Sequence, residues 1–129
     1  GNMYETEFNQ NLGDWDVSAV NDMYAMFQYA KDFDQDIGTW DVSAVRDMAK
    51  MFNFAYEFDQ DVRDWDVAAV TDMNRMFYYA YDFDQNLADW CDADGVTGDY
   101  FAYGSSCEFI FEIEKPTCGA NGNSEPECS

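Results

Sequence analysis

The sequence predicts an α/β repeat solenoid, in which each 25-residue unit contributes one short parallel strand and one short helix. The first observation is a repeated unit, which occurs at 8–32, 33–57 and 58–82 and begins again at 83–90. The second is that each unit carries a strand-like apolar pattern followed by a helix-like one. Because one unit cannot bury its own apolar face, stacked units are expected to share a core and to form a parallel sheet.

The first half of each unit predicts the strand. Trp15 and Val17 alternate with Asp16, so Asp16 is expected to point away from the core. The spacing Leu12-x-x-Trp15-x-Val17-x-x-Val20 is typical of leucine-rich-repeat-like solenoids. The tryptophans are therefore expected to pack in the core. The equivalent residues of the next two units are Ile37, Trp40, Val42 and Val45, then Val62, Trp65, Val67 and Val70.

The second half of each unit predicts the helix. Met23, Met26, Phe27 and Ala30 lie at the spacing i, i+3, i+4, i+7, which places them on one face of a helix. Asp22 precedes them, where it is expected to cap free N–H groups or to lie in the field of the first turn. The equivalent residues are Asp47, Met48, Met51, Phe52 and Ala55, then Asp72, Met73, Met76, Phe77 and Ala80.

Three regions are expected along the chain. Residues 1–7 match the end of a preceding repeat, and the chain is expected to be a piece of a longer protein. Residues 8–90 form a solenoid of three full repeats and the start of a fourth. Residues 91–129 form a cysteine-containing C-terminal cap or the start of a small cysteine-rich module.

The four cysteines all lie in this last region, and they predict two disulfides formed in an oxidising compartment. The cap is therefore expected to be disulfide-stabilised. Three connectivities are open, of which sequential pairing is preferred. The cysteines are Cys91, Cys107, Cys118 and Cys128.

The charge balance restricts the partners. The chain has 27 Asp and Glu against 6 Lys and Arg, no His, and a net charge of −21. Such a chain repels phosphate and anionic lipid surfaces, so nucleic acid and anionic membranes are not expected partners. Divalent cations and cationic surfaces are favoured instead. The absence of an 18-residue apolar run predicts no direct membrane insertion.

The repeat turns single carboxylates into a ladder. Asp16, Asp41 and Asp66 share one position and are expected about 4.8 Å apart on the open strand face. Either hydrogen bonds to neighbouring hydroxyl and N–H groups offset their repulsion, or these three residues bind Ca²⁺. The predicted strand-face ladder is also a candidate contact surface for a protein or glycan, and it comprises Asp14, Asp16, Ser18, Thr39, Asp41, Ser43, Asp64 and Asp66.

Two further columns follow from the repeat. Tyr29, Phe54 and Tyr79, with Tyr81 close by, form an aromatic flank that either packs between units or serves as a protein or sugar interface. A column of glutamines in the return loop fits an internal polar ladder that satisfies backbone groups. These glutamines are Gln10, Gln35, Gln60 and Gln85.

The stretch FDQDIGTWDVSAVRDMAKMF resembles the bacterial-surface-protein repeat of BspA-like proteins and mycoplasma-type lipoproteins, which typically reads FNQDI-x-x-WDVSNVTDM-x-x-MF. The resemblance covers roughly 8–90 and departs from the pattern with Asp for Asn in "FNQ" and Ala for Asn in "VSNV". It implies a leucine-rich-repeat-like fold, an extracellular or surface location, and adhesion or protein recognition. It implies no catalytic residues.

Two functions are therefore expected. The first is a non-catalytic recognition or adhesion module, extracellular or at the cell surface, that binds protein or glycan and requires no cofactor. The alternative is a structural subunit of an extracellular filament or surface assembly, stabilised by Ca²⁺, that self-assembles through its open N-terminal repeat. We expect no enzyme, because a regular solenoid of this size offers no evident cleft for a carboxylate pair.

Overall fold

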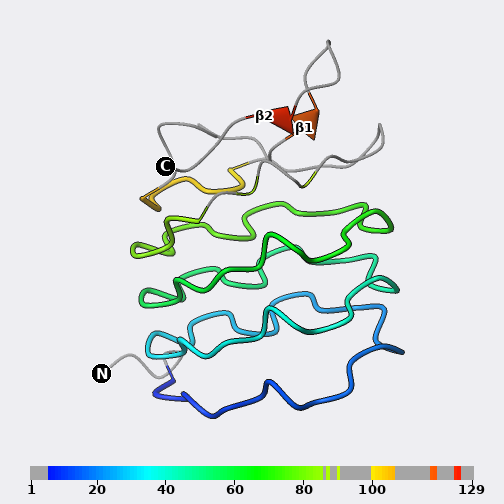
Figure 1. Ribbon diagram of the computed structural model, residues 1–129. Helices are drawn as coiled ribbons and strands as arrows, with labels where there is room; N and C mark the ends of the chain where they lie inside the picture. The colour runs from blue at the N-terminus through cyan, green and yellow to red at the C-terminus, as the bar shows by residue number, and fades with distance from the viewer. Residues whose placement is uncertain are drawn as a thin grey trace.

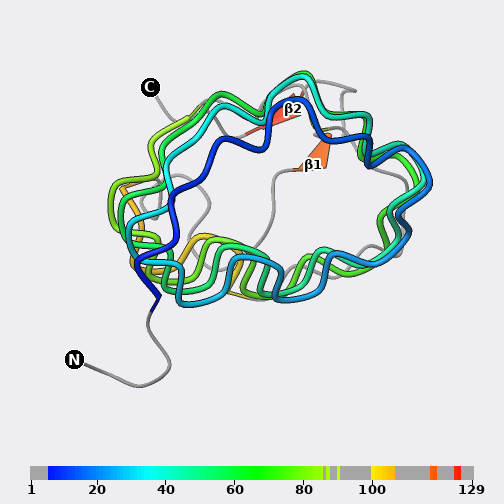
Figure 2. The ribbon, with the colours of Figure 1, turned by 90° about the horizontal axis from the view of Figure 1, so that it is seen from below.

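The computed structural model describes residues 6–85, 87, 90, 100–106, 117–118 and 124–125. The chain winds through successive coils that stack along one axis, beginning with the blue coil at the bottom of Figure 1. Seen along that axis, the coils superimpose into one elongated ring (Figure 2). The first, second and third coils correspond to 8–32, 33–57 and 58–82, and the fourth begins at residue 83.

The predicted α/β architecture is wrong, and the leucine-rich-repeat-like assignment fails with it. The described residues contain no helix, and hence none that is long and apolar enough to cross a membrane. The strands among them are β1 (Thr117–Cys118) and β2 (Ser124–Glu125), which pair antiparallel outside the coils. The isolated bridges in the described part of the chain are parallel, and they are Thr6↔Ala30, Asp22↔Asp47 and Asp47↔Asp72.

Tight turns replace the predicted strand. The N–H of Trp15 donates to the carbonyl of Leu12 at 3.0 Å, and the N–H of Val20 donates to the carbonyl of Val17 at 2.9 Å. These bonds span three residues, so the backbone reverses where an extended strand was expected. The same bonds recur in the second coil as Trp40 to Ile37 and Val45 to Val42, and in the third as Trp65 to Val62 and Val70 to Val67.

Left-handed residues replace the predicted helix. Ala25 and Tyr29 have φ values of 56° and 64°, and the same two positions are left-handed in the next coils, at Lys50, Phe54, Arg75 and Tyr79. A left-handed residue interrupts a right-handed helix because its Cβ approaches the following carbonyl.

Alternate N–H groups then serve different partners. In the second coil the N–H groups of Met48, Lys50, Phe52 and Phe54 donate to carbonyls of the third coil at 2.8–2.9 Å. The intervening N–H groups of Met51, Asn53 and Ala55 donate to carbonyls three residues earlier in their own coil. Every second backbone group therefore holds the stack together, while the others close local turns.

The residues predicted to form the core are nevertheless buried. Met48, Met51, Phe52 and Ala55 are fully buried, and so are their equivalents in the third coil. The turns point these side chains inward at the spacing that suggested a helix face. Aromatic rings stack from coil to coil, with Phe33 5.9 Å from Phe58 and Phe58 6.1 Å from Phe83, Trp40 6.4 Å from Trp65 and Trp65 6.3 Å from Trp90.

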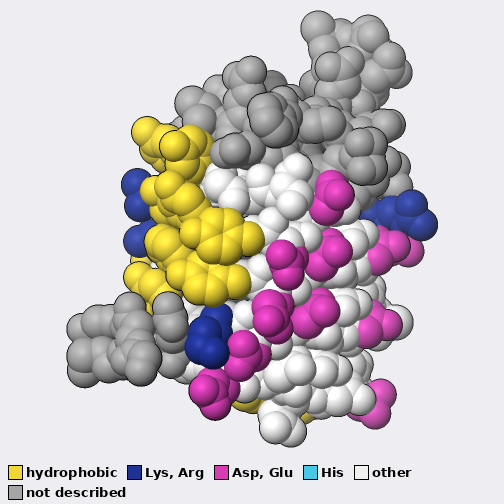
Figure 3. Space-filling model, turned by 90° about the vertical axis from the view of Figure 1, so that its left-hand side faces the viewer, with side chains coloured by type: hydrophobic (Ala, Val, Ile, Leu, Met, Phe, Trp, Pro, Cys, Tyr) yellow, Lys and Arg dark blue, Asp and Glu magenta, His cyan; other side chains and the backbone are white. Residues whose placement is uncertain are grey.

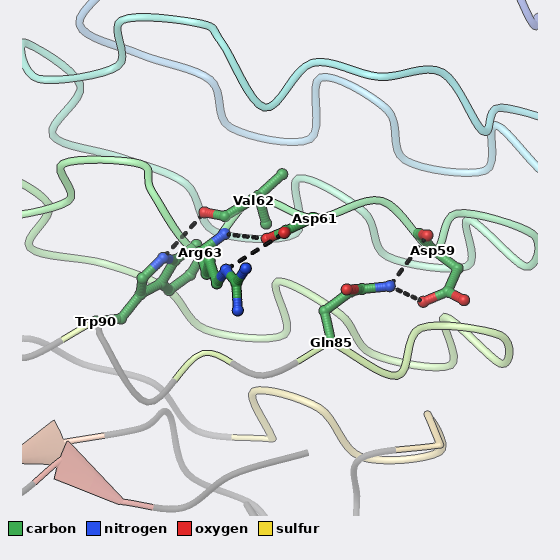
Figure 4. Close-up of polar contacts among 6 residues, drawn as sticks. All are labelled: Asp59, Asp61, Val62, Arg63, Gln85 and Trp90. Carbon is green, nitrogen blue, oxygen red and sulfur yellow. Dashed lines mark hydrogen bonds and ion pairs between the residues drawn. The ribbon is translucent and has the colours of Figure 1, made fainter. Parts of the chain in front are cut away.

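Each buried tryptophan also bonds to the coil before it. The indole N–H of Trp65 donates to the carbonyl of Ile37 at 3.0 Å, and that of Trp90 donates to Val62 at 3.1 Å (Figure 4). The Ile37 carbonyl also accepts the backbone N–H of Trp40, so one oxygen ties a turn to the next coil. Trp15, in the first coil, is 55% exposed, and the prediction that it is a core residue is wrong.

The glutamine column forms a polar ladder, although its partners are not other glutamines. The side-chain amide of Gln85 donates to Asp59 Oδ1 at 2.8 Å and to its carbonyl at 3.2 Å (Figure 4). The same oxygen of Asp59 accepts the N–H of Asp84. Gln35 and Gln60 bond in the same way to Asn9 and Asp34 of the preceding coil.

Trp65→Phe tests the role of the indole bond. Loss of the bond to Ile37 and of part of the buried ring is expected to lower the free energy of unfolding by about 1–3 kcal/mol. The matched control is Trp15→Phe, which is expected to change it by less than about 0.5 kcal/mol because that ring is exposed. Urea denaturation measures both, and equal losses would contradict the assignment.

Candidate functional site

Most carboxylates of the repeat are turn-forming groups. At three positions of each coil, a side-chain oxygen accepts the N–H of the residue two places later at 2.9–3.1 Å, as Asp47 does from Ala49. Such Asx turns offer the backbone an alternative to helix or sheet hydrogen bonds. The residues are Asn11, Asp36 and Asp61, Asp16, Asp41 and Asp66, and Asp22, Asp47 and Asp72.

The predicted strand-face ladder therefore lies on turns. Asp16 accepts both the N–H and the hydroxyl of Ser18, the latter at 2.6 Å, and Asp41 bonds to Ser43 with the same geometry. Asp66 accepts only the N–H of Ala68, which has no hydroxyl. Asp14, Thr39 and Asp64 are exposed.

In the described ranges, no three or more His, Cys, Asp or Glu side chains gather closely enough to hold a metal ion. The calcium site at Asp16, Asp41 and Asp66 stays a prediction.

The serine contacts perturb the acidity of the ladder. Hydrogen bonds from the hydroxyl and then the N–H of Ser18 hold the pKa of Asp16 below its usual value. The same bonds from Ser43 lower the pKa of Asp41, against opposing contributions from desolvation and from the negative charge of Asp16. The charges of neighbouring coils thus repel, and the serines offset that repulsion locally.

Ser43→Ala tests this balance. A folded-state pKa below the unfolded value, which is about 3.9 for Asp, stabilises the fold above that value, and the contribution is lost as pH falls through the folded pKa. The variant is therefore expected to raise the pKa of Asp41 and to be less stable than the parent at neutral pH, with the difference vanishing in acid. Carboxyl NMR titration and denaturation at several pH values measure both effects. Thr39→Ala removes an exposed hydroxyl and should leave the pKa of Asp41 unchanged; an equal shift there would rule out the serine contact as the cause.

The predicted aromatic flank is a continuous stack. The Tyr29 ring lies 5.4 Å from Phe54, and Phe54 lies 5.5 Å from Tyr79, all nearly parallel. Tyr56 and Tyr81 stack beside them at 4.9 Å. We define the aromatic ladder as Tyr29, Phe54, Tyr56, Tyr78, Tyr79, Tyr81, Tyr100 and Tyr103. It packs between coils and also stays accessible, as a hydrophobic band along the side of the stack (Figure 3).

The left-handed backbone positions the central column of the ladder. Tyr29, Phe54 and Tyr79 have φ values of 64°, 60° and 54°, a conformation that costs about 1–3 kcal/mol for each such residue. Gly104 takes the equivalent position in the fourth coil, with φ 83°, and a Cβ there would lie 2.5 Å from Tyr79 Cδ1. Only glycine fits against that ring, so the column ends at Tyr79 and Tyr103 meets it edge-on at 5.6 Å.

The ladder is uncharged but lies between groups of opposite charge. Desolvation, with smaller contributions from Tyr103 and Tyr78, raises the pKa of Tyr79 above its ordinary value. On one side, the Arg75 guanidinium lies 4.9 Å from the Tyr78 ring and 5.4 Å from the Tyr100 ring. On the other side, carboxylates run alongside the band (Figure 3).

The repeat also forms an acidic column, which we define as Asp32, Glu57 and Asp82. Each follows directly in sequence on a column formed by Lys31, Tyr56 and Tyr81. Backbone bonds from Glu57 to Lys31 at 3.2 Å and from Asp82 to Tyr56 at 3.0 Å hold the two columns in register.

The N-terminal end of the stack presents a second apolar surface. Trp15 is 55% exposed, Met26 38% and Phe8 37%, whereas their equivalents in the second coil are buried beneath the first. These side chains border a hollow of about 380 Å³. Its lining residues are Thr6, Phe8, Leu12, Trp15, Met26, Phe27, Gln28 and Ala30.

Some sequence-predicted features fall on residues that the structure does not describe, and the structure adds one feature that was not predicted. Cys91, Cys107 and Cys128 lie outside the described residues, as does the side chain of Cys118, so the disulfides stay predictions. Residues 100–106 continue the stack, since Phe77 and Tyr79 donate backbone bonds to Phe101 and Tyr103.

Arg75, Tyr100 and Tyr103 were missed as parts of the site. The 25-residue spacing of the repeat could have identified them. Tyr100 lies 25 residues after Arg75, and Tyr103 lies 25 residues after Tyr78. The change of pattern at Cys91 hid that spacing.

Fold and site together define an acidic protein of stacked coils with an aromatic ladder along one side. The chain belongs to the family DUF285, described as Mycoplasma protein of unknown function, whose model matches residues 2–109. No curated protein and no solved structure shows significant similarity to the chain. The family match supports the resemblance to mycoplasma-type repeat proteins, but it does not support the specific BspA-like assignment.

Proposed function

We propose that this protein is a non-catalytic recognition module, BspA-like in role, that acts outside the cell or at its surface and binds protein or glycan through the aromatic ladder. The observation that carries the proposal is the exposed band of ordered rings (Figure 3). Tyr81, Tyr100 and Tyr103 are 50%, 42% and 38% exposed. Tyrosine-rich surfaces of this kind are typical of interfaces.

The rigidity of the ladder supports recognition. Each ring of the central column stacks on its neighbour, and the backbone beneath it is bonded to the next coil, as Phe54 is to Tyr78. Rings that are already ordered lose little conformational entropy when a partner binds. The ladder is therefore preorganised for contact.

The acidic residues favour binding over catalysis. A glycosidase needs one carboxyl with a raised pKa, whereas the shifts of Asp16 and Asp41 are downward and their side chains are exposed. The four cysteines, together with the resemblance to surface repeats, favour an oxidising extracellular location.

The double variant Tyr81→Ala, Tyr103→Ala tests the proposal. The parent protein is expected to bind at least one component of an array of glycans and extracellular-matrix proteins, and the variant to bind it about tenfold or more weakly. Tyr24→Ala removes a tyrosine of similar exposure, 51%, that lies outside the ladder, and should bind as the parent does. Absence of parent binding, or equal effects of the two variants, would reject the ladder as a recognition surface.

A second candidate function is that of a structural subunit that self-associates through the N-terminal end. The observation that favours it is the exposure of Trp15, because the equivalent Trp40 and Trp65 are only 4% exposed beneath a neighbouring coil. A second copy that covers this end would bury the same apolar set that every internal coil buries. The net charge of −21 opposes such contact, so salt should strengthen it.

Sedimentation velocity over a range of protein concentrations tests this candidate. We expect the sedimentation coefficient to rise with concentration, more so with added NaCl or Ca²⁺, and Trp15→Ser to abolish the rise. Tyr24→Ala should behave as the parent does. A monomer under every condition would exclude the assembly function, and an absence of any effect specific to Ca²⁺ would exclude a calcium-stabilised assembly.

A further inference from the structure

We infer that the aromatic ladder and the acidic column beside it bind a lysine- or arginine-rich segment of a partner protein. This inference depends on the proposed recognition function and specifies the chemistry of the partner. It follows from three features of the described residues, which are the cations that already lie on tyrosine rings, the substitution of Lys31 along its column, and the charge of the chain.

Tyrosine rings of this fold already hold cations. Arg75 lies over Tyr78 and Tyr100 at 4.9 and 5.4 Å, and Lys50 lies 5.9 Å from the centre of the Tyr24 ring. These distances are within the range of cation–π attraction. Tyr81 and Tyr103 are exposed, and within the described part of the chain no cation lies over their rings. The ladder therefore offers further ring faces of the same kind.

Lys31 shows where a cation fits beside the acidic column. Its ammonium lies 3.4 Å from the carboxylate of Asp32 in the first coil. In the second and third coils tyrosine replaces this lysine, as Tyr56 and Tyr81. The carboxylates of Glu57 and Asp82, both exposed, are left with no ion-pair partner among the described side chains. A cation of the partner that binds at these coils would contact a tyrosine ring and a carboxylate at the same time.

The charge of the chain favours this occupant over others. With 27 acidic and 6 basic residues, the protein attracts cationic segments and repels anionic ones before contact. Four of the described basic side chains are already engaged, Lys31 and Arg63 by carboxylates and Lys50 and Arg75 by rings. These four described cations are therefore not free to compete for Glu57 and Asp82. A neutral glycan could also stack on the rings, but it would leave the carboxylates unneutralised.

Fluorescence anisotropy with three labelled probes tests the inference. The probes are a peptide of alternating arginine and glycine, the same peptide with glutamate for arginine, and a neutral oligosaccharide of N-acetylglucosamine. We expect the arginine peptide alone to bind. The double variant Glu57→Gln, Asp82→Asn should weaken binding of the arginine peptide about tenfold. The charge-matched double variant Asp14→Asn, Asp64→Asn should weaken that binding by less than about twofold, because salt screens distant charges.

A second pair of variants separates ring contact from net charge. Arg75→Gln frees the faces of Tyr78 and Tyr100 within the ladder and is expected to raise affinity for the arginine peptide about two- to fivefold. Lys50→Gln makes the same change of charge but frees only Tyr24, outside the ladder, and should have a smaller effect.

Three outcomes would overturn the inference. Equal weakening by the two acidic pairs would show general attraction rather than a site and would overturn it. Binding of the oligosaccharide without the arginine peptide would also overturn it, but would leave the proposed recognition function standing. Failure of all three probes to bind would overturn it as well, and the array of glycans and matrix proteins would then decide the recognition function separately.

Discussion

One carbonyl oxygen in each coil connects the local structure to the stack. Ile37 accepts the backbone N–H of Trp40, which closes a turn, and the indole N–H of Trp65 from the next coil. Leu12 and Val62 do the same for their neighbours. The tryptophan ring is thus held in register by a directional bond as well as by burial, and the rings of successive coils stack upon one another. The alternation of N–H groups between turn and neighbour depends on that register.

The acidic composition of the chain follows from its backbone of turns. A backbone made of turns leaves many N–H groups without helix or sheet partners, and short acidic side chains accept them, as Asp47 does from Ala49. Three such turns in each coil account for much of the excess of Asp over Lys and Arg. The repulsion that results is partly offset by the serine contacts of Asp16 and Asp41. Glu57 and Asp82, which lie outside these turns, have no ion-pair partner among the described side chains.

The core could be predicted from the sequence, and the backbone could not. The spacing of Met48, Met51, Phe52 and Ala55 identifies the buried face correctly because side-chain burial follows apolar periodicity whichever turns produce it. The left-handed positions of the first three coils carry Ala, Lys, Arg, Tyr and Phe rather than Gly or Asn, so no residue type marked the interruption of a helix there. At the site, Tyr29, Phe54, Tyr79 and Tyr81 were predictable from the repeat. The cation sites were not, since Arg75 reaches Tyr100 across coils and beyond the point where the pattern changes.

The most direct test of this account is to identify the acceptor of a single N–H group. NMR scalar couplings across hydrogen bonds, measured on isotopically labelled protein, reveal which carbonyl receives the N–H of Phe52. Stacked coils require the carbonyl of Met76, 2.8 Å away in the next coil. The helix suggested by the apolar spacing requires the carbonyl of Met48 instead. A coupling to Met76 would support the stack, and a coupling to Met48 would contradict it.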